Sequence, residues 1–161
     1  MADARIFADL KADHDRHREL LAEIASTAAG DAERDRLFEA FRIEVSAHAA
    51  AEEESLYAMM LGKPDLRDDA RHSVSEHKEI DDFFGEMAEM DSFSDTWRKT
   101  FDKMRHRYEH HIGEEEEEMF PAAAEELTDD EEAKLADVFE ERKPKELERA
   151  EAEPAGGDER D

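Results

Sequence analysis

Two His-x-x-x-Glu motifs are the parts of this sequence best suited to chemistry. His48 precedes Glu52, and His111 precedes Glu115, by four residues. On a helix, this spacing places both side chains of a pair on the same face, about one turn apart. The chain contains no cysteine, so imidazole nitrogen and carboxylate oxygen are the ligand atoms available to a metal ion. Such ligands suit iron or manganese, with zinc as a further candidate.

An internal repeat adds two more histidines to these motifs. When the sequence is shifted by 63 residues, His14 falls on His77, His48 on His111 and Glu52 on Glu115, and Glu53 falls on Glu116. Large apolar residues recur at the same offset, as in Leu21 with Phe84 and Phe38 with Phe101. The repeat predicts two similar helical hairpins that pack face to face and bring six polar side chains into one layer.

Long segments with apolar residues at helical spacing must position these six residues. The pattern predicts helices over about 3–28, 31–61 and 67–90, and a fourth that begins after Ser94 and stops near Pro121. Thr128 and Glu131 form a capping box for a fifth helix, whose small apolar face should lie against the others. We therefore expect an all-α fold: an antiparallel up-down four-helix bundle with an additional C-terminal helix.

The domain boundary is expected near residue 143. Residues 1–143 should form the bundle and the short fifth helix, since 161 residues suffice for one domain but not two. Residues 144–161 are highly charged and have few side chains able to bury apolar area. They are therefore predicted to be a frayed helix that passes into a disordered tail.

The six polar residues lie on apolar seams that should face the core. Buried ionised carboxylates without a partner cost several kcal/mol each, and no Lys or Arg lies on the seams at this layer. A pair of metal ions would supply the missing positive charge. The alternative is a hydrogen-bonded polar layer without metal, which would have to place four histidines and two glutamates together by packing alone.

The other histidines do not share this pattern. His17 lies on the first seam but aligns with Ile80, and is interpreted as a core residue or a contact of a metal ligand. His72, His106 and His110 are expected to face solvent. His110 and Glu114 also have the four-residue spacing, but the apolar stripe and the repeat both select His111 and Glu115 instead.

The ordered set of four histidines and two glutamates, with the acidic runs after His48 and His111, resembles the hemerythrin-like (HHE cation-binding) family over about residues 8–121. The resemblance implies two iron ions, oxo- or hydroxo-bridged, with manganese or zinc as alternatives. It implies that the terminal ligands are His14, His48, His77 and His111, and that the bridges are Glu52 and Glu115. Oxygen-carrying members have a further histidine paired with the third-helix His77, whereas Ser73 and Asp81 stand at those positions. Whether Asp81, Tyr57 or Tyr108 also ligates metal stays open.

Two classes of function remain after composition is considered. The formal net charge of -26 disfavours nucleic acid and anionic membranes as partners, and the first residues resemble neither a signal peptide nor a membrane anchor, so a cytoplasmic protein is expected. The resemblance favours a di-iron site that binds or reacts with oxygen or peroxide, with catalase-like or peroxidase-like activity as one outcome. The alternative is a module that senses or stores iron, oxygen or nitric oxide without turnover. A protein partner could then bind the C-terminal helix. A structural bundle stabilised by zinc is a third interpretation.

Overall fold

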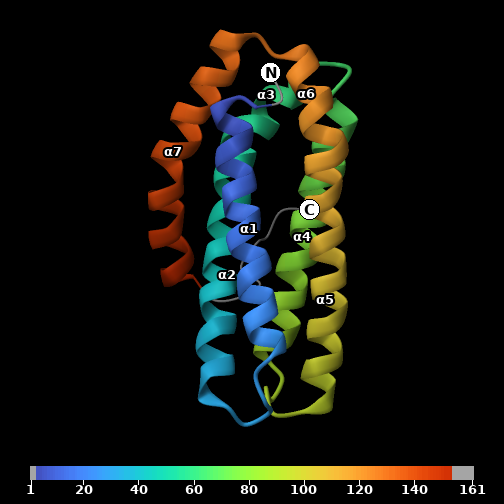
Figure 1. Cartoon of the computed structure of the whole chain (residues 1–161), viewed down its shortest axis with the longest axis vertical. Coiled ribbons are helices and arrows are strands. Elements are labelled where there is room, and N and C mark those ends of the chain that lie inside the picture. The colour runs from blue at the N-terminus through green and yellow to red at the C-terminus, as the bar shows by residue number, and fades with distance from the viewer. Residues whose placement is uncertain (1–2, 154–161) are drawn as a thin grey trace.

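Four long helices form the body of the molecule, and the computed structural model describes residues 3–153 of the chain. They are α1 (Arg5–Ala25), α2 (Ala32–Glu52), α4 (Arg67–Ala88) and α5 (Asp95–Glu114). Successive helices run in opposite directions and are joined by short turns (Figure 1). Every regular element in the described range is helical, so the predicted all-α antiparallel bundle is confirmed.

The second and fourth helices each continue through a π-helical turn. After α2 come η1 (Glu53–Tyr57) and α3 (Ala58–Leu61), and after α5 come η2 (Glu115–Met119) and α6 (Phe120–Glu126). The predicted end near Pro121 is therefore wrong, because the helix runs on to Glu126. At the end of η2 the Phe120 N–H already bonds the Glu115 carbonyl, five residues back, and Pro121 stands in the first turn of α6, where its missing N–H is tolerated. Single π turns inside helices often occur at functional sites.

Side-chain caps fix the starts of three helices. The Asp31 carboxylate accepts from the Glu33 N–H, and the Ser94 hydroxyl accepts from the Trp97 N–H. Thr128 and Glu131 form the predicted capping box at the start of α7 (Asp129–Ala152). Each cap satisfies a backbone donor that the first helical turn leaves free, which sets the register of the helix that follows.

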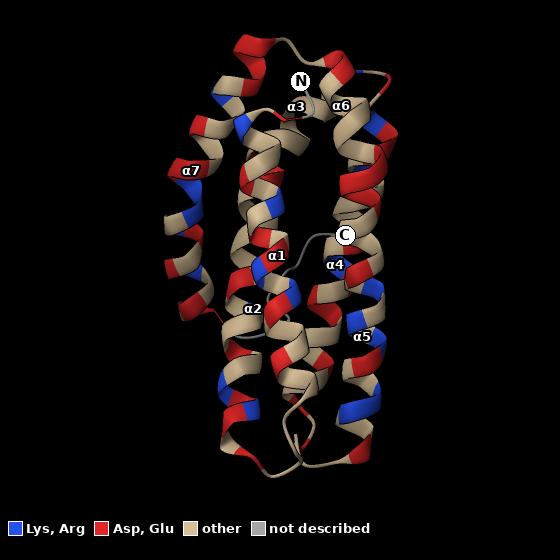
Figure 2. Ribbon diagram, viewed as in Figure 1, with Lys and Arg blue, Asp and Glu red and all other residues tan. Residues whose placement is uncertain are grey.

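Two apolar clusters fill the bundle on either side of a polar layer. One contains Phe7, Leu56, Met60 and Phe120 among its members. The other contains Leu21, Phe41, Phe84 and Phe101. Acidic residues are spread along α1, α2, α5 and α7 rather than gathered on one of them (Figure 2). Within the described residues, no helix is long and apolar enough to cross a membrane.

The helix α7 packs along the outside of α2 and α1 (Figure 1). It continues through Pro144 to Ala152, so residues 144–152 are helical as expected but docked rather than frayed. Ala150 is buried and its carbonyl accepts a hydrogen bond from Arg42, at 3.3 Å. Small buried side chains and a hydrogen bond to the backbone therefore dock a segment that has little apolar area. Residues 154–161 of the expected tail lie outside the described residues.

Candidate metal centre

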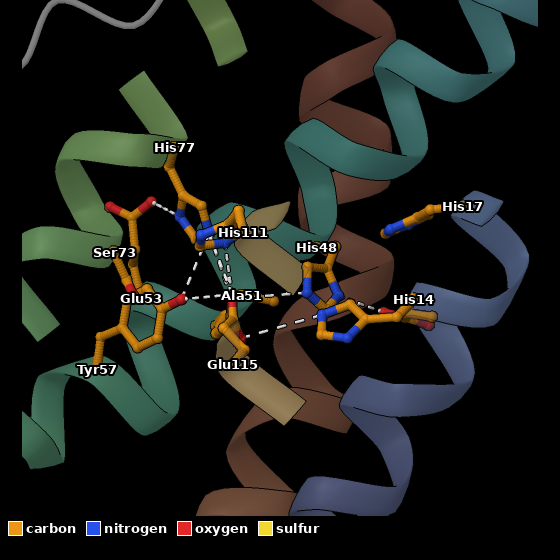
Figure 3. Close-up of polar contacts among 12 residues, drawn as sticks. His14, His17, His48, Ala51, Glu53, Tyr57, Ser73, His77, His111 and Glu115 are labelled. Carbon is orange, nitrogen blue, oxygen red and sulfur yellow. Dashed lines mark hydrogen bonds and ion pairs between the residues drawn. The ribbon is translucent and has the colours of Figure 1, made fainter. Parts of the chain in front are cut away.

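The six predicted site residues come from five elements and meet in the polar layer. Figure 3 labels all of them except Glu52. His14 lies on α1, His48 and Glu52 on α2, His77 on α4, His111 on α5, and Glu115 begins η2. None of the six is more than 6% exposed. The structure therefore brings together the whole set that the repeat selected.

Their ligand atoms form two overlapping groups. One group contains His14, His48 and Glu52, and the other contains Glu52, His77, His111 and Glu115; within each, the ligand atoms lie within 4.8 Å of one another. Glu52 belongs to both groups. Its Oε1 lies 3.6 Å from His48 Nε2 and 3.4 Å from His77 Nε2, so one carboxylate stands between the two hairpins.

Many of the inward-facing atoms lack a hydrogen-bond partner. The set comprises Nε2 of His14 and His48, both carboxylate oxygens of Glu52, and Oε2 of Glu115, while His111 Nε2 lies 2.5 Å from Glu115 Oε1. Buried polar atoms in proteins are almost always hydrogen-bonded. A concentration of unpartnered nitrogen and oxygen atoms in one buried layer fits a centre that holds metal ions.

Four carboxylates orient the four histidines from outside the layer. Each histidine directs its Nδ1 to one acidic side chain, at 2.7–2.9 Å: His14 to Glu116, His48 to Asp13, His77 to Glu53, and His111 to Glu76. A carboxylate that accepts a hydrogen bond from Nδ1 keeps the proton on that nitrogen. Nε2 is then unprotonated and can bind a metal ion, which is the usual arrangement around metal-binding histidines. The geometry of the rings thus supports ligation through Nε2.

These orienting carboxylates obey the same repeat as the ligands. Asp13 aligns with Glu76 and Glu53 with Glu116 at the offset of 63 residues. The first pair acts within its own hairpin, whereas Glu53 and Glu116 each reach a histidine of the other hairpin. Sequence reasoning did not single out any of these four carboxylates as a contact of a histidine in the layer. The offset itself was the signal that could have found them.

The carboxylates draw positive charge into the layer. Burial alone would lower the pKa of His48, but Glu52 and Asp13 outweigh it and raise that pKa to about 9. Burial is likewise outweighed at His111, where Glu115 and Glu76 raise the pKa to about 10. Burial would raise the pKa of Glu52, yet the neighbouring histidines hold it well below the usual range. Positive charge is therefore favoured at His48 and His111, whereas burial and the charge of His111 lower the pKa of His77.

Two buried tyrosines and His17 surround the layer. The Tyr57 hydroxyl donates to Glu115 Oε1 at 2.8 Å and lies 3.5 Å from His77 Nε2. The Tyr108 hydroxyl and His17 Nδ1 are 2.7 Å apart. Burial, with the nearby charge of Glu115, raises the pKa of both tyrosines well above 10, so both hydroxyls keep their protons. Tyr57 is the tyrosine whose oxygen reaches the ligand set.

The remaining histidines lie where the sequence indicated. His17 is fully buried, and its ring centroid lies 5.1 Å from that of His48, as expected of a core residue beside the site. His72, His106 and His110 are exposed. The sequence predicted His111 rather than His110 as the site residue. Their positions are consistent with this, because His111 is buried in the layer and His110 is exposed.

A pocket of about 560 Å³ connects one side of the layer with the surface. It reaches His48 and His77, one histidine from each hairpin. Asp81 lines this pocket rather than joining the two groups of ligand atoms. The apolar part of the wall consists of Val45, Ile80, Phe84 and Tyr108. A small molecule therefore has a route toward both groups.

The hemerythrin HHE cation-binding domain model matches residues 5–123. The chain belongs to the hemerythrin HHE cation-binding domain family. Its fold is similar to that of a hemerythrin HHE cation-binding domain-containing protein from Mycobacterium kansasii, with a TM-score of 0.78, 23% identity, and coverage of 89% of this chain and 87% of that one. A comparison with curated proteins found no match. The HHE domain thus has a buried His/Glu cluster able to hold metal ions, and α7 begins beyond the matched residues.

Proposed function

We propose that this HHE domain holds two iron ions and binds or reacts with oxygen or peroxide. His14 and His48 would be terminal ligands of one ion, and His77 and His111 of the other. Glu52 and Glu115 would bridge the two. The observation that carries this proposal is the overlap of two ligand groups at Glu52, since a carboxylate shared by two groups is suited to join two ions.

The number and type of ligands support a pair of ions rather than one. Two clusters of inward nitrogen atoms, one in each hairpin, flank the central carboxylates. Two divalent or trivalent cations would neutralise these carboxylates and give each unpartnered Nε2 atom a bond. Imidazole and carboxylate ligation without sulfur suits iron and manganese, with zinc also possible.

The surroundings of the site favour reaction with a small ligand. When bound, an iron pair supplies the redox capacity to exchange electrons with oxygen or peroxide. The pocket that reaches His48 and His77 would admit such a ligand. Tyr57 holds a proton on its hydroxyl at hydrogen-bond distance from Glu115, and the four orienting carboxylates keep the imidazoles in place.

Metal analysis with spectroscopy and peroxide assays tests this function. Protein purified in air should contain about two irons per chain and show ultraviolet absorption typical of a bridged ferric pair. A catalase-like reaction converts two molecules of hydrogen peroxide into two of water and one of oxygen, and oxygen evolution in proportion to iron content would support it. Colourless protein that retains a single zinc ion would contradict the proposal.

A sensing or storage role is the second candidate, and the contacts of α7 favour it. Lys143 on α7 bonds Asp13 at 2.8 Å, and Asp13 accepts from His48. The Phe139 ring meets the His48 ring edge to face, with centroids 5.9 Å apart. Iron loading could thereby change how α7 docks and how it presents itself to a protein partner. Negligible peroxide turnover, together with iron-dependent hydrogen exchange in α7, would favour this role over the enzyme.

A further inference from the structure

Two more His-x-x-x-Glu pairs meet on the surface formed by α4 and α5. The first is His72 with Glu76, and the second is His110 with Glu114. His72 Nε2 lies 3.5 Å from Glu76 Oε1 and 3.8 Å from Glu114 Oε2. His110 Nε2 lies 2.9 Å from Glu114 Oε1. Two histidines and two carboxylates from neighbouring helices therefore face one another outside the polar layer.

We propose that these four residues form a second cation site, which binds a divalent first-row transition ion such as Zn²⁺ or Fe²⁺. Nitrogen and oxygen ligands lie about 2.1 Å from zinc, so tetrahedral geometry places two ligand atoms about 3.4 Å apart. The separations of His72 Nε2 from Glu76 and from Glu114, 3.5 and 3.8 Å, are close to this value. His110 Nε2, 2.9 Å from Glu114 Oε1, is the candidate fourth ligand.

The contact between helices distinguishes this cluster from ordinary pairs along one helix. Spacing alone explains why His72 approaches Glu76 and why His110 approaches Glu114. It does not explain why His72 on α4 also faces Glu114 on α5. The ligand atoms of His72, Glu76 and Glu114 lie within 4.8 Å of one another, and His110 reaches this group through Glu114, at 2.9 Å. The cluster therefore depends on helix packing and not on local sequence alone.

The charges around the cluster also favour a cation. Glu76 is only 7% exposed, and its Oε1 accepts from the core ligand His111 at 2.8 Å. The nearby arginines Arg105 and Arg107 pair with Glu109 and Glu79, so these guanidinium groups do not occupy the cluster. A formal net charge of -26 raises the local concentration of divalent ions further. Glu76 would link the surface ion to the inner centre.

Zinc titration of the full-length protein tests the site. Calorimetry and metal analysis should find one more Zn²⁺ per chain in the unaltered protein than in a His72→Ala/His110→Ala double variant, or binding at least tenfold tighter. His106→Ala is the matched control and should leave this zinc in place. Because the readout is a difference between variants, it does not depend on whether the inner centre binds iron.

Two further outcomes decide the assignment. Glu114→Gln should weaken zinc binding about tenfold, whereas Glu117→Gln, which removes the same charge from an exposed neighbour, should not. Equal zinc stoichiometry and affinity in the unaltered protein and the double variant, with unchanged helical circular dichroism, would overturn the proposal. A loss in His106→Ala equal to that in His110→Ala would also overturn it, because the ligands would then lie along α5 alone.

Discussion

The two hairpins are alike around the ligands and different one step farther out. Asp13 and Glu76 each contact Nδ1 of a histidine in the polar layer, at the same distance of 2.8 Å. Asp13 is then covered by α7, whose Lys143 bonds it, whereas Glu76 lies beneath the exposed His72. The two halves of the repeat therefore share the acidic residue that orients the histidine. They differ in the residue that covers this acidic side chain.

The second pair of orienting carboxylates shows the same contrast. Arg18 makes two hydrogen bonds to Glu116, each of 3.1 Å. The repeat places Asp81 at the position equivalent to Arg18, and Asp81 lines the pocket together with Glu53. One side of the layer is thus closed by an arginine, while the other side opens to the surface. This difference assigns a direction of access to a centre that is otherwise nearly symmetrical.

Replacing single histidines by alanine should have the largest effect on the amount of iron bound. His111→Ala removes an inward ligand, so iron that survives dialysis against a weak chelator should fall by at least half. His110→Ala should retain it, because His110 points outward. If the ligand layer is symmetrical, His48→Ala should lose about as much iron as His111→Ala. Elemental analysis checks all three, and retention of iron by His111→Ala would show that the layer does not bind metal as proposed.

Removing the ions tests whether the shared layer stabilises both hairpins. Loss of the partner of a buried charge costs about 3–5 kcal/mol, although protons on His48 and His111 offset part of this cost. A loss of about 3 kcal/mol lowers the melting temperature of a chain of this size by about 6–12 °C. Differential scanning calorimetry of chelated and reloaded protein measures the shift. An unchanged melting temperature at neutral pH would contradict a stabilising role for the ions.

The fold and the ligand layer could be predicted because both leave periodic signals in the sequence. Apolar spacing predicted the four helices, and Thr128 with Glu131 predicted the start of α7. The offset of 63 residues predicted which polar side chains would meet. It selected His111 rather than His110, because His111 aligns with His48. These inferences needed only helix geometry and the cost of burying charge.

The remaining features depend on tertiary contacts that no local pattern encodes. Helix continuation past Pro121 requires the π turn η2, in which the bonding pattern changes before the proline. The docking of residues 144–152 depends on Arg42 and Glu54, which are distant in sequence. Charged composition suggested disorder there because it reflects the lack of apolar area and not the polar contacts that a distant segment supplies. The contact of His72 with Glu114 likewise requires the packing of α4 on α5.

Lys143 provides a sharper test of the difference between the hairpins. Lys143→Met removes the ammonium group from Asp13 and should loosen His48 but not His111. We expect one of the two irons to be released to a chelator about threefold faster, a modest effect for a residue one contact farther from the metal than the orienting carboxylates. Lys145→Met is the control, because exposed Lys145 pairs only with Glu141 in the described contacts. Equal acceleration of both irons would show that α7 acts on the whole centre.

The C-terminal half of α7 carries an acidic contact that should respond to pH. Burial and the neighbouring Glu54 raise the pKa of Glu146 to about 7, against the partial opposition of Arg149 and Arg142. Glu146, Glu54 and Arg42 of α2 all line the pocket that reaches His48 and His77. A proton on Glu146 removes its repulsion with Glu54, so the docked helix favours the protonated form.

The smallest expected effect is therefore a pH dependence of the docking of α7. The hairpin of α4 and α5, on which α7 does not pack, should not show it. A carboxyl group whose pKa rises from 4.5 to about 7 on docking stabilises the docked helix at low pH, and this contribution is lost as pH rises through about 7. After correction for intrinsic rates, exchange of amides in residues 144–152 should be roughly fivefold slower at pH 5.5 than at pH 8, or about 1 kcal/mol once solvent screening is allowed for. Glu146→Gln supplies a permanent donor to Glu54, so most of the dependence should disappear while the helix stays docked. The described structure records no contact between α4 and Glu146. If amides of α4 showed an equal pH response, the effect would therefore belong to the bundle as a whole and not to Glu146.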